Sequence, residues 1–322
     1  MTGIEYSLVG DIGGTHARFA LVAAGSVTLE RVQVLTCGDY DSLEAALRLY
    51  LADAGVERVI SACLAVASPL RGDEVRMTNN PWCFSIAALR EQFGWQVLKV
   101  VNDFTAMALG VPHVPAERLV PVCGGMGDPD RPRLVIGPGT GLGVSGLVPV
   151  ADGWAPLVTE GGHVDFAPLD DAEMAIQRWL QARFGRVSVE RLLCGPGLLN
   201  LYQAHAELSG LAAPLAGPGE ITAAALDGSD ELAHRSLRHF CLLLGRVAGN
   251  AALTLGSFGG VYICGGMVPR FVDFLRQSEF QAGFENKGRM RPLMEATPVF
   301  VVTEPFTGLL GAAEALVNPR VS

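Results

Sequence analysis

Short apolar runs and helically spaced apolar positions alternate over roughly the first third of the chain. Three apolar runs come first, and a helix capped by Ser42 follows them. Strands and helices then alternate. The expected elements are strands at 6–10, 17–22, 27–35, 59–66 and 97–101, and helices at 43–54, 86–93 and 103–109. This order predicts an α/β fold with a mixed sheet covered by helices.

The opening pattern recurs in the second half. Residues 8–15 and 134–143 each predict a strand that ends in a glycine-rich turn and leads into another strand. We therefore expect an internal duplication of one α/β unit, with extra helices in the second copy and a ligand cleft between the two domains. The further elements expected are strands at 154–159, 261–264 and 299–302, and helices at 172–183, 231–255 and 268–276. The turn-rich stretch 112–133 is the expected boundary.

The composition disfavours a nucleic-acid-binding protein and a membrane protein. The chain has 322 residues, enough for about two domains, and a formal net charge of −9 disfavours nucleic acid as a partner. Seven cysteines, with no CxxC pair, are typical of reduced, buried thiols in a cytoplasmic protein. The uncharged stretch 247–269 contains six glycines, which favours a helix, a turn and a strand over a membrane span.

The first glycine-rich turn is a candidate phosphate site. Backbone N–H groups in such a turn can bind an anion, and Asp11 would suit a hydrated Mg²⁺ held against a triphosphate. A plain hairpin turn remains the alternative interpretation. The candidate residues are Gly10, Asp11, Ile12, Gly13, Gly14 and Thr15.

Two further glycine turns strengthen that interpretation. The second contains Gly139, Thr140 and Gly141, and the apolar segment with a proline that follows it excludes a Rossmann turn, which needs a helix there. The chain also lacks the GxxxxGK[ST] string of P-loop enzymes. The third turn, Gly265-Gly266, stands between a strand and a helix, where it leaves room for adenine or ribose or is simply a helix entry.

Polar residues after predicted strands are candidates for substrate chemistry. Asn102 and Asp103 end one strand, where Asp103 could accept a proton or merely cap the next helix. Glu160 and His163 stand around a Gly-Gly turn that suits a polyol, although a polar loop and a weaker metal site are alternatives. Glu190 lies in the first turn of a helix, where a glutamate ordinarily complements the helix dipole. The remaining histidines are interpreted as solvated or core residues.

Motifs along nearly the whole chain carry a resemblance to a known family. They lie at 10–18, 77–82, 101–106, 139–143, 160–168, 190–197, 265–270 and 284–289. The glycine turns resemble the phosphate and adenosine motifs of the superfamily of actin, sugar kinases and heat-shock chaperone ATPases. The EGGHVDFAP string together with the Asn102-Asp103 pair resembles, more narrowly, the bacterial ATP-dependent glucokinases of the non-ROK type.

The resemblance implies a fold and a reaction. It implies duplicated ribonuclease H-like domains of the actin-like ATPase kind, with a small domain of residues 1–112 plus 305–322 and a large domain of residues 113–304. The reaction is phosphoryl transfer from Mg-ATP to the 6-hydroxyl of glucose, the first step of glycolysis. Such proteins are cytoplasmic and usually homodimeric. The ROK zinc signature is absent, so no zinc is expected.

The resemblance also implies roles for single residues. Asp103 matches the catalytic base, and Asn102, Asp103, Glu160, His163 and Glu190 match the sugar-binding residues. His16 departs from the family pattern, in which Asn is common after the first turn. Two rival functions remain open: a kinase for another hexose, and a catalytically inactive sugar or nucleotide sensor.

Overall fold

A computed structural model describes residues 5–56, 58–70 and 72–321. Its internal contacts divide the chain into two compact units. Unit 1 runs to Ala116 and also contains Val150–Val158 and the chain from Glu304 onward, whereas unit 2 comprises Glu117–Pro149 and Thr159–Thr303. Residues 1–4 and 322 of the expected small domain lie outside the described residues.

Unit 1 is built on a five-stranded sheet with the order β3-β2-β1-β4-β7. Its strands are β1 (Tyr6–Ile12), β2 (His16–Ala23), β3 (Glu30–Thr36), β4 (Ser61–Val66) and β7 (Val97–Asn102). β1 and β2 are antiparallel, as are β2 and β3, whereas β1, β4 and β7 run parallel. Their apolar side chains form one buried cluster around Phe19, Leu64 and Tyr50.

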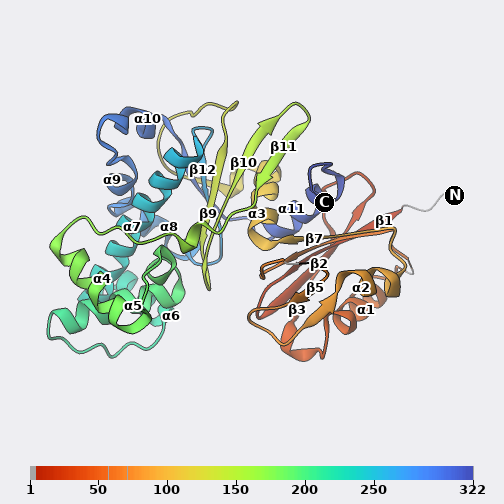
Figure 1. Cartoon of the computed structure of the whole chain (residues 1–322), viewed down its shortest axis with the longest axis horizontal. Coiled ribbons are helices and arrows are strands. Elements are labelled where there is room, and N and C mark those ends of the chain that lie inside the picture. Colours follow the sequence, from red (N-terminus) through yellow and green to blue (C-terminus); the bar gives the residue numbers. More distant parts are fainter. Residues whose placement is uncertain (1–4, 57, 71, 322) are drawn as a thin grey trace. The chain divides into compact units, whose positions relative to one another are not determined.

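Helices cover both faces of this sheet. Figure 1 shows α3 (Asp103–Gly110) and α11 (Thr307–Val317) on one face and α1 (Leu43–Asp53) and α2 (Ile86–Phe93) on the other. The side chain of Ser42 caps α1, as the sequence predicted, by accepting a hydrogen bond from the backbone N–H of Ala45. α11 approaches α3 so closely that a Cβ on Gly311 would overlap the carbonyl of Ala106. Glycine at 311 therefore lets the last helix of the chain lie against the sheet.

Unit 1 also contains a small hairpin that the pattern did not predict. β5 (Glu74–Arg76) pairs antiparallel with β6 (Cys83–Ser85), and the loop between them carries the Asn79-Asn80 pair. Two 3₁₀ turns, η1 (Cys37–Asp39) and η2 (Val111–His113), complete the unit. The hairpin strands have three residues each, too few to produce a visible alternation of apolar and polar positions.

The six-stranded sheet repeats the order of the first. The order is β11-β10-β9-β12-β13-β8, formed by β8 (Leu119–Cys123), β9 (Arg133–Pro138), β10 (Leu142–Val150), β11 (Gly153–Leu157), β12 (Val261–Ile263) and β13 (Val299–Val302). β9 is antiparallel to β10 and parallel to β12, as β1 is to β2 and β4. The predicted duplication and fold class are confirmed. β8 is a strand that the sequence did not predict: residues 119–123, within the turn-rich stretch expected as the boundary, pair with β13.

The extra helices of the second copy lie between β11 and β12, as expected. They are α4 (Asp171–Phe184), α5 (Gly195–Leu208), α6 (Pro218–Asp227) and α7 (Glu231–Leu255), with the 3₁₀ turns η4 (Gly161–His163) and η5 (Val189–Arg191) before α4 and α5. After β12 come η6 (Val268–Phe271), α8 (Val272–Gln277), α9 (Phe280–Glu285), η7 (Gly288–Met290) and α10 (Arg291–Ala296). The helix expected at 268–276 therefore begins as a 3₁₀ turn. Elsewhere in the chain, the short 3₁₀ turn η3 (Ala116–Arg118) precedes β8.

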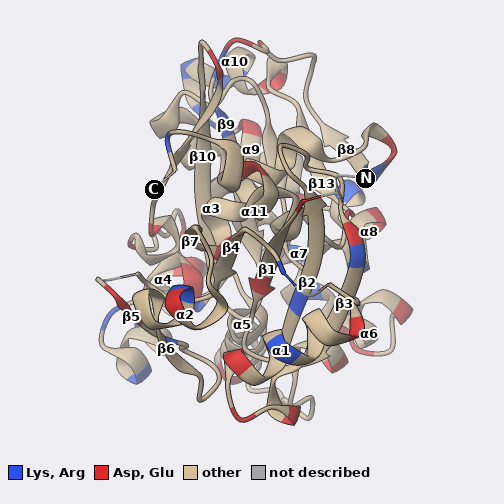
Figure 2. Cartoon of the chain, turned by 90° about the vertical axis from the view of Figure 1, so that its right-hand side faces the viewer, with Lys and Arg blue, Asp and Glu red and all other residues tan. Residues whose placement is uncertain are grey.

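Charged residues lie mainly on helices and loops, and the strands are largely free of them (Figure 2). All seven cysteines are free thiols, of which Cys83 is exposed and Cys123 partly exposed. Among the described residues, no helix combines the length and the apolar character that crossing a membrane requires.

Candidate functional site

The first glycine turn joins β1 to β2 and carries a poorly compensated carboxylate. The N–H of Gly13 donates to the carbonyl of His16 at 2.9 Å, which closes the turn. The Asp11 side chain is only 14% exposed, and its ion pair with Arg18 is long, at 3.4 Å. Burial raises the pKa of Asp11 above its usual range, and Arg18 opposes that rise. A buried carboxylate with one distant cation is suited to receive a further positive charge.

Segments distant in sequence hold this turn. Nδ2 of Asn80 donates to the carbonyl of Gly13 at 3.0 Å. A Cβ on Gly14 would lie 2.6 Å from Cβ of Asn79, and one on Gly308 would lie 3.0 Å from the carboxylate of Asp11. Sequence reasoning did not assign these neighbours a role, although the Asn79-Asn80 pair belongs to one of the stretches that carry the family resemblance.

The Asn102-Asp103 pair stands at the same edge of the sheet as the first turn. Ile12 lies opposite Val66, and Val66 lies opposite Asn102, so two strand spacings of about 5 Å separate the turn from the pair. Oδ1 of Asn102 accepts hydrogen bonds from the N–H groups of Phe104 at 2.9 Å and Thr105 at 3.3 Å. Asn102, rather than Asp103, is therefore the N-cap of α3, and Asp103 is the first helical residue.

In unit 2, the second and third glycine turns are packed together. The N–H of Gly139 donates to the carbonyl of Gly141 at 2.8 Å, and Thr140 is exposed at the tip of the turn. Gly265 has a φ of 89°, and a Cβ there would lie 2.8 Å from the carbonyl of Pro138. Gly265 and Gly266 follow β12, whose neighbour β9 leads into the second turn, so both turns end parallel strands at one edge.

The three sugar-site candidates of unit 2 lie on two short 3₁₀ turns. Glu160 precedes η4, which contains His163, and Glu190 lies in η5. Nδ1 of His163 is 3.9 Å from Oε1 of Glu190, and Oε2 of Glu190 accepts a hydrogen bond from the N–H of Leu142 at 2.8 Å. The side chains of His163 and Glu190 are 58% and 29% exposed, so solvent or a ligand can reach both.

The glycine turns and the polar side chains can bind two different kinds of chemical group. Glycine turns at the carboxyl ends of parallel strands offer backbone N–H groups to an anion, in unit 1 as in unit 2. Asn102 and Asp103 in unit 1, and separately Glu160, His163 and Glu190 in unit 2, carry amide, carboxylate and imidazole groups that can hydrogen-bond to hydroxyl groups. Asp11 has the hard oxygen ligands that Mg²⁺ prefers, and its weak compensation by Arg18 fits such an ion.

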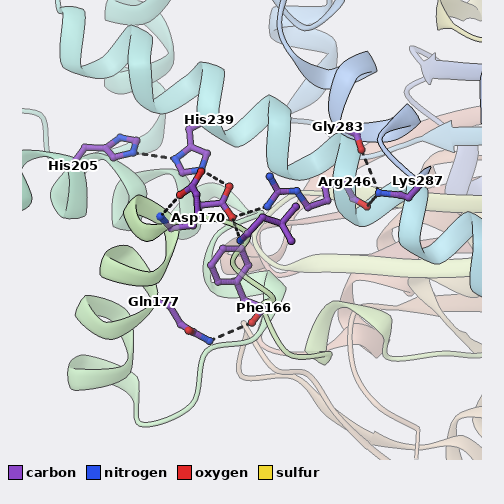
Figure 3. Close-up of polar contacts among 10 residues, drawn as sticks. Phe166, Asp170, Gln177, His205, His239, Arg246, Gly283 and Lys287 are labelled. Carbon is purple, nitrogen blue, oxygen red and sulfur yellow. Dashed lines mark hydrogen bonds and ion pairs between the residues drawn. The ribbon is translucent and has the colours of Figure 1, made fainter. Parts of the chain in front are cut away.

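A second polar cluster, in unit 2, is distinct from these residues (Figure 3). Glu173, 2% exposed, accepts hydrogen bonds from Arg246 at 2.6 Å and from the N–H of Leu169 at 2.8 Å, and lies 3.7 Å from His239. Nε2 of His205 is 3.0 Å from Nδ1 of His239. His205 and His239 are both partly buried, so they lie between the solvated and the core environment that the sequence left open. Each group of the cluster has protein partners, so its role is to join α4, α5 and α7.

The chain is similar to known proteins both in sequence and in structure. A family model described as Glucokinase matches residues 8–319. The chain is 68% identical to a protein named Glucokinase from Marinobacter nauticus and 57% identical to one from Hahella chejuensis, over 321 residues and the full length of each chain. A solved glucokinase from an Antarctic psychrotroph is 36% identical, with a TM-score of 0.89 over 98% of this chain and all of that chain. A ROK family glucokinase from Streptomyces griseus, 17% identical with a TM-score of 0.63 over 96% of this chain and 98% of that one, shares the fold.

Proposed function

We propose, because the chain belongs to the glucokinase family, that this protein transfers the γ-phosphoryl group of ATP to the 6-hydroxyl of D-glucose. The products are glucose 6-phosphate and ADP, and the reaction is the first step of glycolysis. The observation that carries the proposal is that Asp103 and the first glycine turn lie at the same edge of the unit 1 sheet, two strand spacings apart. That edge is where α/β sheets bind ligands.

Sugar binding is assigned, from the family resemblance, to the hydrogen-bonding side chains at positions 102, 103, 160, 163 and 190. Asn102 uses Oδ1 to cap α3, so its Nδ2 amide is the part that donates to a sugar hydroxyl. Glu160 and Glu190 accept from hydroxyls, and His163 donates or accepts according to its tautomer. Each hydroxyl of glucose left without a partner would cost binding energy, so this set favours a sugar over an apolar ligand.

Asp103 is the proposed general base. Its carboxylate accepts the proton of the 6-hydroxyl while O6 forms a bond to the γ-phosphorus. The bond between that phosphorus and the oxygen bridging to the β-phosphate breaks, and ADP leaves with the electron pair. The N–H of Phe104 donates to Oδ1 of Asp103 at 2.9 Å, which orients the carboxylate at the start of α3.

The glycine turns are assigned to the nucleotide. Phosphate oxygens are assigned to the turns at 10–15 and 139–141, through backbone N–H groups other than those of Gly13 and Gly139, which already donate within the turns. Gly265 and Gly266 leave space for the adenosine. Asp11 would hold Mg²⁺ that arrives with ATP. When bound, that ion neutralises charge on the transferring phosphoryl group.

Glucose-dependent release of ADP from Mg-ATP tests the proposal. Asp103→Asn should lower kcat about 10²–10⁴-fold with little change in the affinity for glucose, because it removes the proton acceptor and keeps the hydrogen-bonding shape. Asp41→Asn is the matched control, since Asp41 is an exposed carboxylate of the same unit. Near-normal turnover in Asp103→Asn would refute the role of Asp103.

A panel of hexoses in the same assay separates the rival functions. Faster turnover of mannose or an N-acetylated hexosamine than of glucose would make the protein a kinase for that sugar. Nucleotide binding without turnover of any hexose would indicate a catalytically inactive sensor. The family resemblance further favours a homodimer in the cytoplasm, and light scattering should give twice the mass of one chain.

A further inference from the structure

Glu190 joins the sugar-site residues of unit 2 to the second glycine turn. Its Oε1 faces His163 at 3.9 Å, while its Oε2 accepts the 2.8 Å hydrogen bond from the N–H of Leu142. Leu142 follows Gly141 directly and begins β10. A Cβ on Gly141 would lie 2.6 Å from Oε2 of Glu190, so the carboxylate rests on the backbone of the turn itself.

A second contact ties the same two segments. The N–H of Gly195 donates to the carbonyl of Gly139 at 2.8 Å, and Gly195 begins α5 shortly after η5. In addition, Sγ of Cys194 lies 3.0 Å from the carbonyl of Glu190, which fixes the backbone that presents the glutamate. The turn at 139–141 is therefore held at Gly139 by a backbone contact and at Leu142 by a side chain.

We propose that Glu190, besides binding sugar, is a positioning residue for ATP: its Oε2 holds the N–H of Leu142 and so keeps the turn at 139–141 in the shape that binds phosphate. The inference rests on the proposed function, because it takes this turn to be a nucleotide site. One carboxylate then serves both substrates, with Oε1 facing the sugar side and Oε2 the phosphate turn.

The hydrogen bond from the N–H of Leu142 to Glu190 is suited to a positioning role. A hydrogen bond from a backbone N–H to a carboxylate is stronger than one between neutral groups. The Glu190 side chain is 29% exposed, so the bond is partly shielded from water, and a bound sugar would shield it further. A sugar hydroxyl that donates to Oε1 also restricts the rotation of the carboxylate. Binding of sugar should then favour binding of nucleotide, and the reverse, by the same factor.

Binding of Mg-AMPPNP in the absence of sugar, measured by calorimetry, isolates the proposed role. Glu190→Ala should bind the nucleotide about tenfold more weakly than the unmodified protein. Glu190→Gln should stay within about twofold, because its side-chain oxygen can accept from Leu142, yet its KM for glucose should rise. Glu160→Ala is the matched control, which should raise the KM for glucose and leave the affinity for nucleotide unchanged.

Glu190→Asp is a second variant that tests the same role if Glu190→Ala folds poorly. It keeps the charge but is one methylene shorter, so it should lose the bond to Leu142 and weaken Mg-AMPPNP as Glu190→Ala does. Unmodified affinity for Mg-AMPPNP in both Glu190→Ala and Glu190→Asp, with thermal unfolding as in the parent, would overturn the inference. The same preparation of unmodified protein is assayed with glucose and ATP, so failure of the proposed function would be seen separately, as absence of phosphorylation.

Discussion

The two glycine turns occupy equivalent places in two copies of one fold, yet they are completed in different ways. The first turn contains its own carboxylate, Asp11, which is opposed by Arg18 on the adjacent strand. The second has no charged residue between Gly137 and Gly143, and its carboxylate comes from Glu190, far along the chain. A duplicated backbone therefore presents two turns with different electrostatic character.

The partners of the two carboxylates suggest different requirements. Among the described residues Asp11 has one ion pair, which is long, and burial raises its pKa, so a bound cation would stabilise its charged form. Glu190 accepts a short backbone hydrogen bond, for which an uncharged oxygen would also serve. We infer that the first turn depends on negative charge and that the second depends on a hydrogen-bond acceptor.

Exchanging each carboxylate for its amide tests that difference and should give the largest effect. Asp11→Asn should lower kcat/KM for Mg-ATP by about 10²-fold, because an amide is a poor ligand for the Mg²⁺ that accompanies ATP. Glu190→Gln should leave the KM for ATP nearly unchanged. Steady-state rates at several Mg²⁺ concentrations provide the measurement. An equal increase in the KM for ATP in Asp11→Asn and Glu190→Gln would show that both turns need a charged group.

Acid stability extends the comparison to Glu173, a buried carboxylate of unit 2. Burial alone would raise its pKa, but the neighbouring His239 and the hydrogen bonds from Arg246 and the N–H of Leu169 outweigh burial and bring the pKa to about 2. A carboxyl group with a lowered pKa stabilises the fold above its unfolded pKa, so about 3 kcal/mol should be lost as the pH falls from 4.5 toward 2.

Protonation linked to His205 should lower the stability of the fold at a higher pH than protonation of Glu173 does. Burial and the neighbouring His239 lower its pKa from 6.5 to about 3, so the unfolded chain takes up this proton first as the pH falls below 6.5. Thermal unfolding between pH 7.5 and pH 2 measures the loss of stability that each group causes. His205→Gln should flatten the decline between pH 6.5 and 4.5, whereas a curve with the parent's slope in that variant would argue against His205 as its source.

Alanine in the two turns should give the smallest effect. A Cβ at Gly14 would lie 2.6 Å from Cβ of Asn79, whereas at Gly139 its nearest neighbour would be the carbonyl of Gly141 at 3.9 Å. Gly14→Ala should lower the free energy of unfolding by about 1–3 kcal/mol, since the loop at 79–80 must shift. Gly139→Ala should change it by less than about 1 kcal/mol. Denaturant unfolding of the pair provides the test, and a smaller loss for Gly14→Ala than for Gly139→Ala would contradict it.

Helices with clear local signals at their ends were predicted closely. The helix expected at 231–255 is α7, and the helix expected at 86–93 is α2. Both end at a glycine in the left-handed conformation, Gly256 and Gly94. Local signals of this kind determine where a helix begins and ends without information from distant segments.

Elements that depend on distant partners were missed. β8 exists because Leu119–Cys123 pairs with β13, about 180 residues later, and Pro121 within it favours a turn when only the sequence is considered. The sequence placed Glu190 in the first turn of a helix, whereas Glu190 lies in the separate 3₁₀ turn η5. α5 begins only at Gly195, with a Gly-Pro-Gly stretch that is typical of a loop, and burial of Leu198, Leu201 and Tyr202 against neighbouring helices stabilises it as a helix. Tertiary packing outweighs weak local preference in both.

The sequence by itself determined most of the strands, though not β5, β6 or β8, together with the three glycine turns and the polar residues that follow them, because turn geometry and apolar periodicity are local properties. Only the tertiary structure decided which groups complete each turn: Asn80 and Gly308 at the first, Glu190 at the second. Those contacts join residues about 50 to 300 positions apart, so they arise only when the sheet and its helices have brought distant segments together.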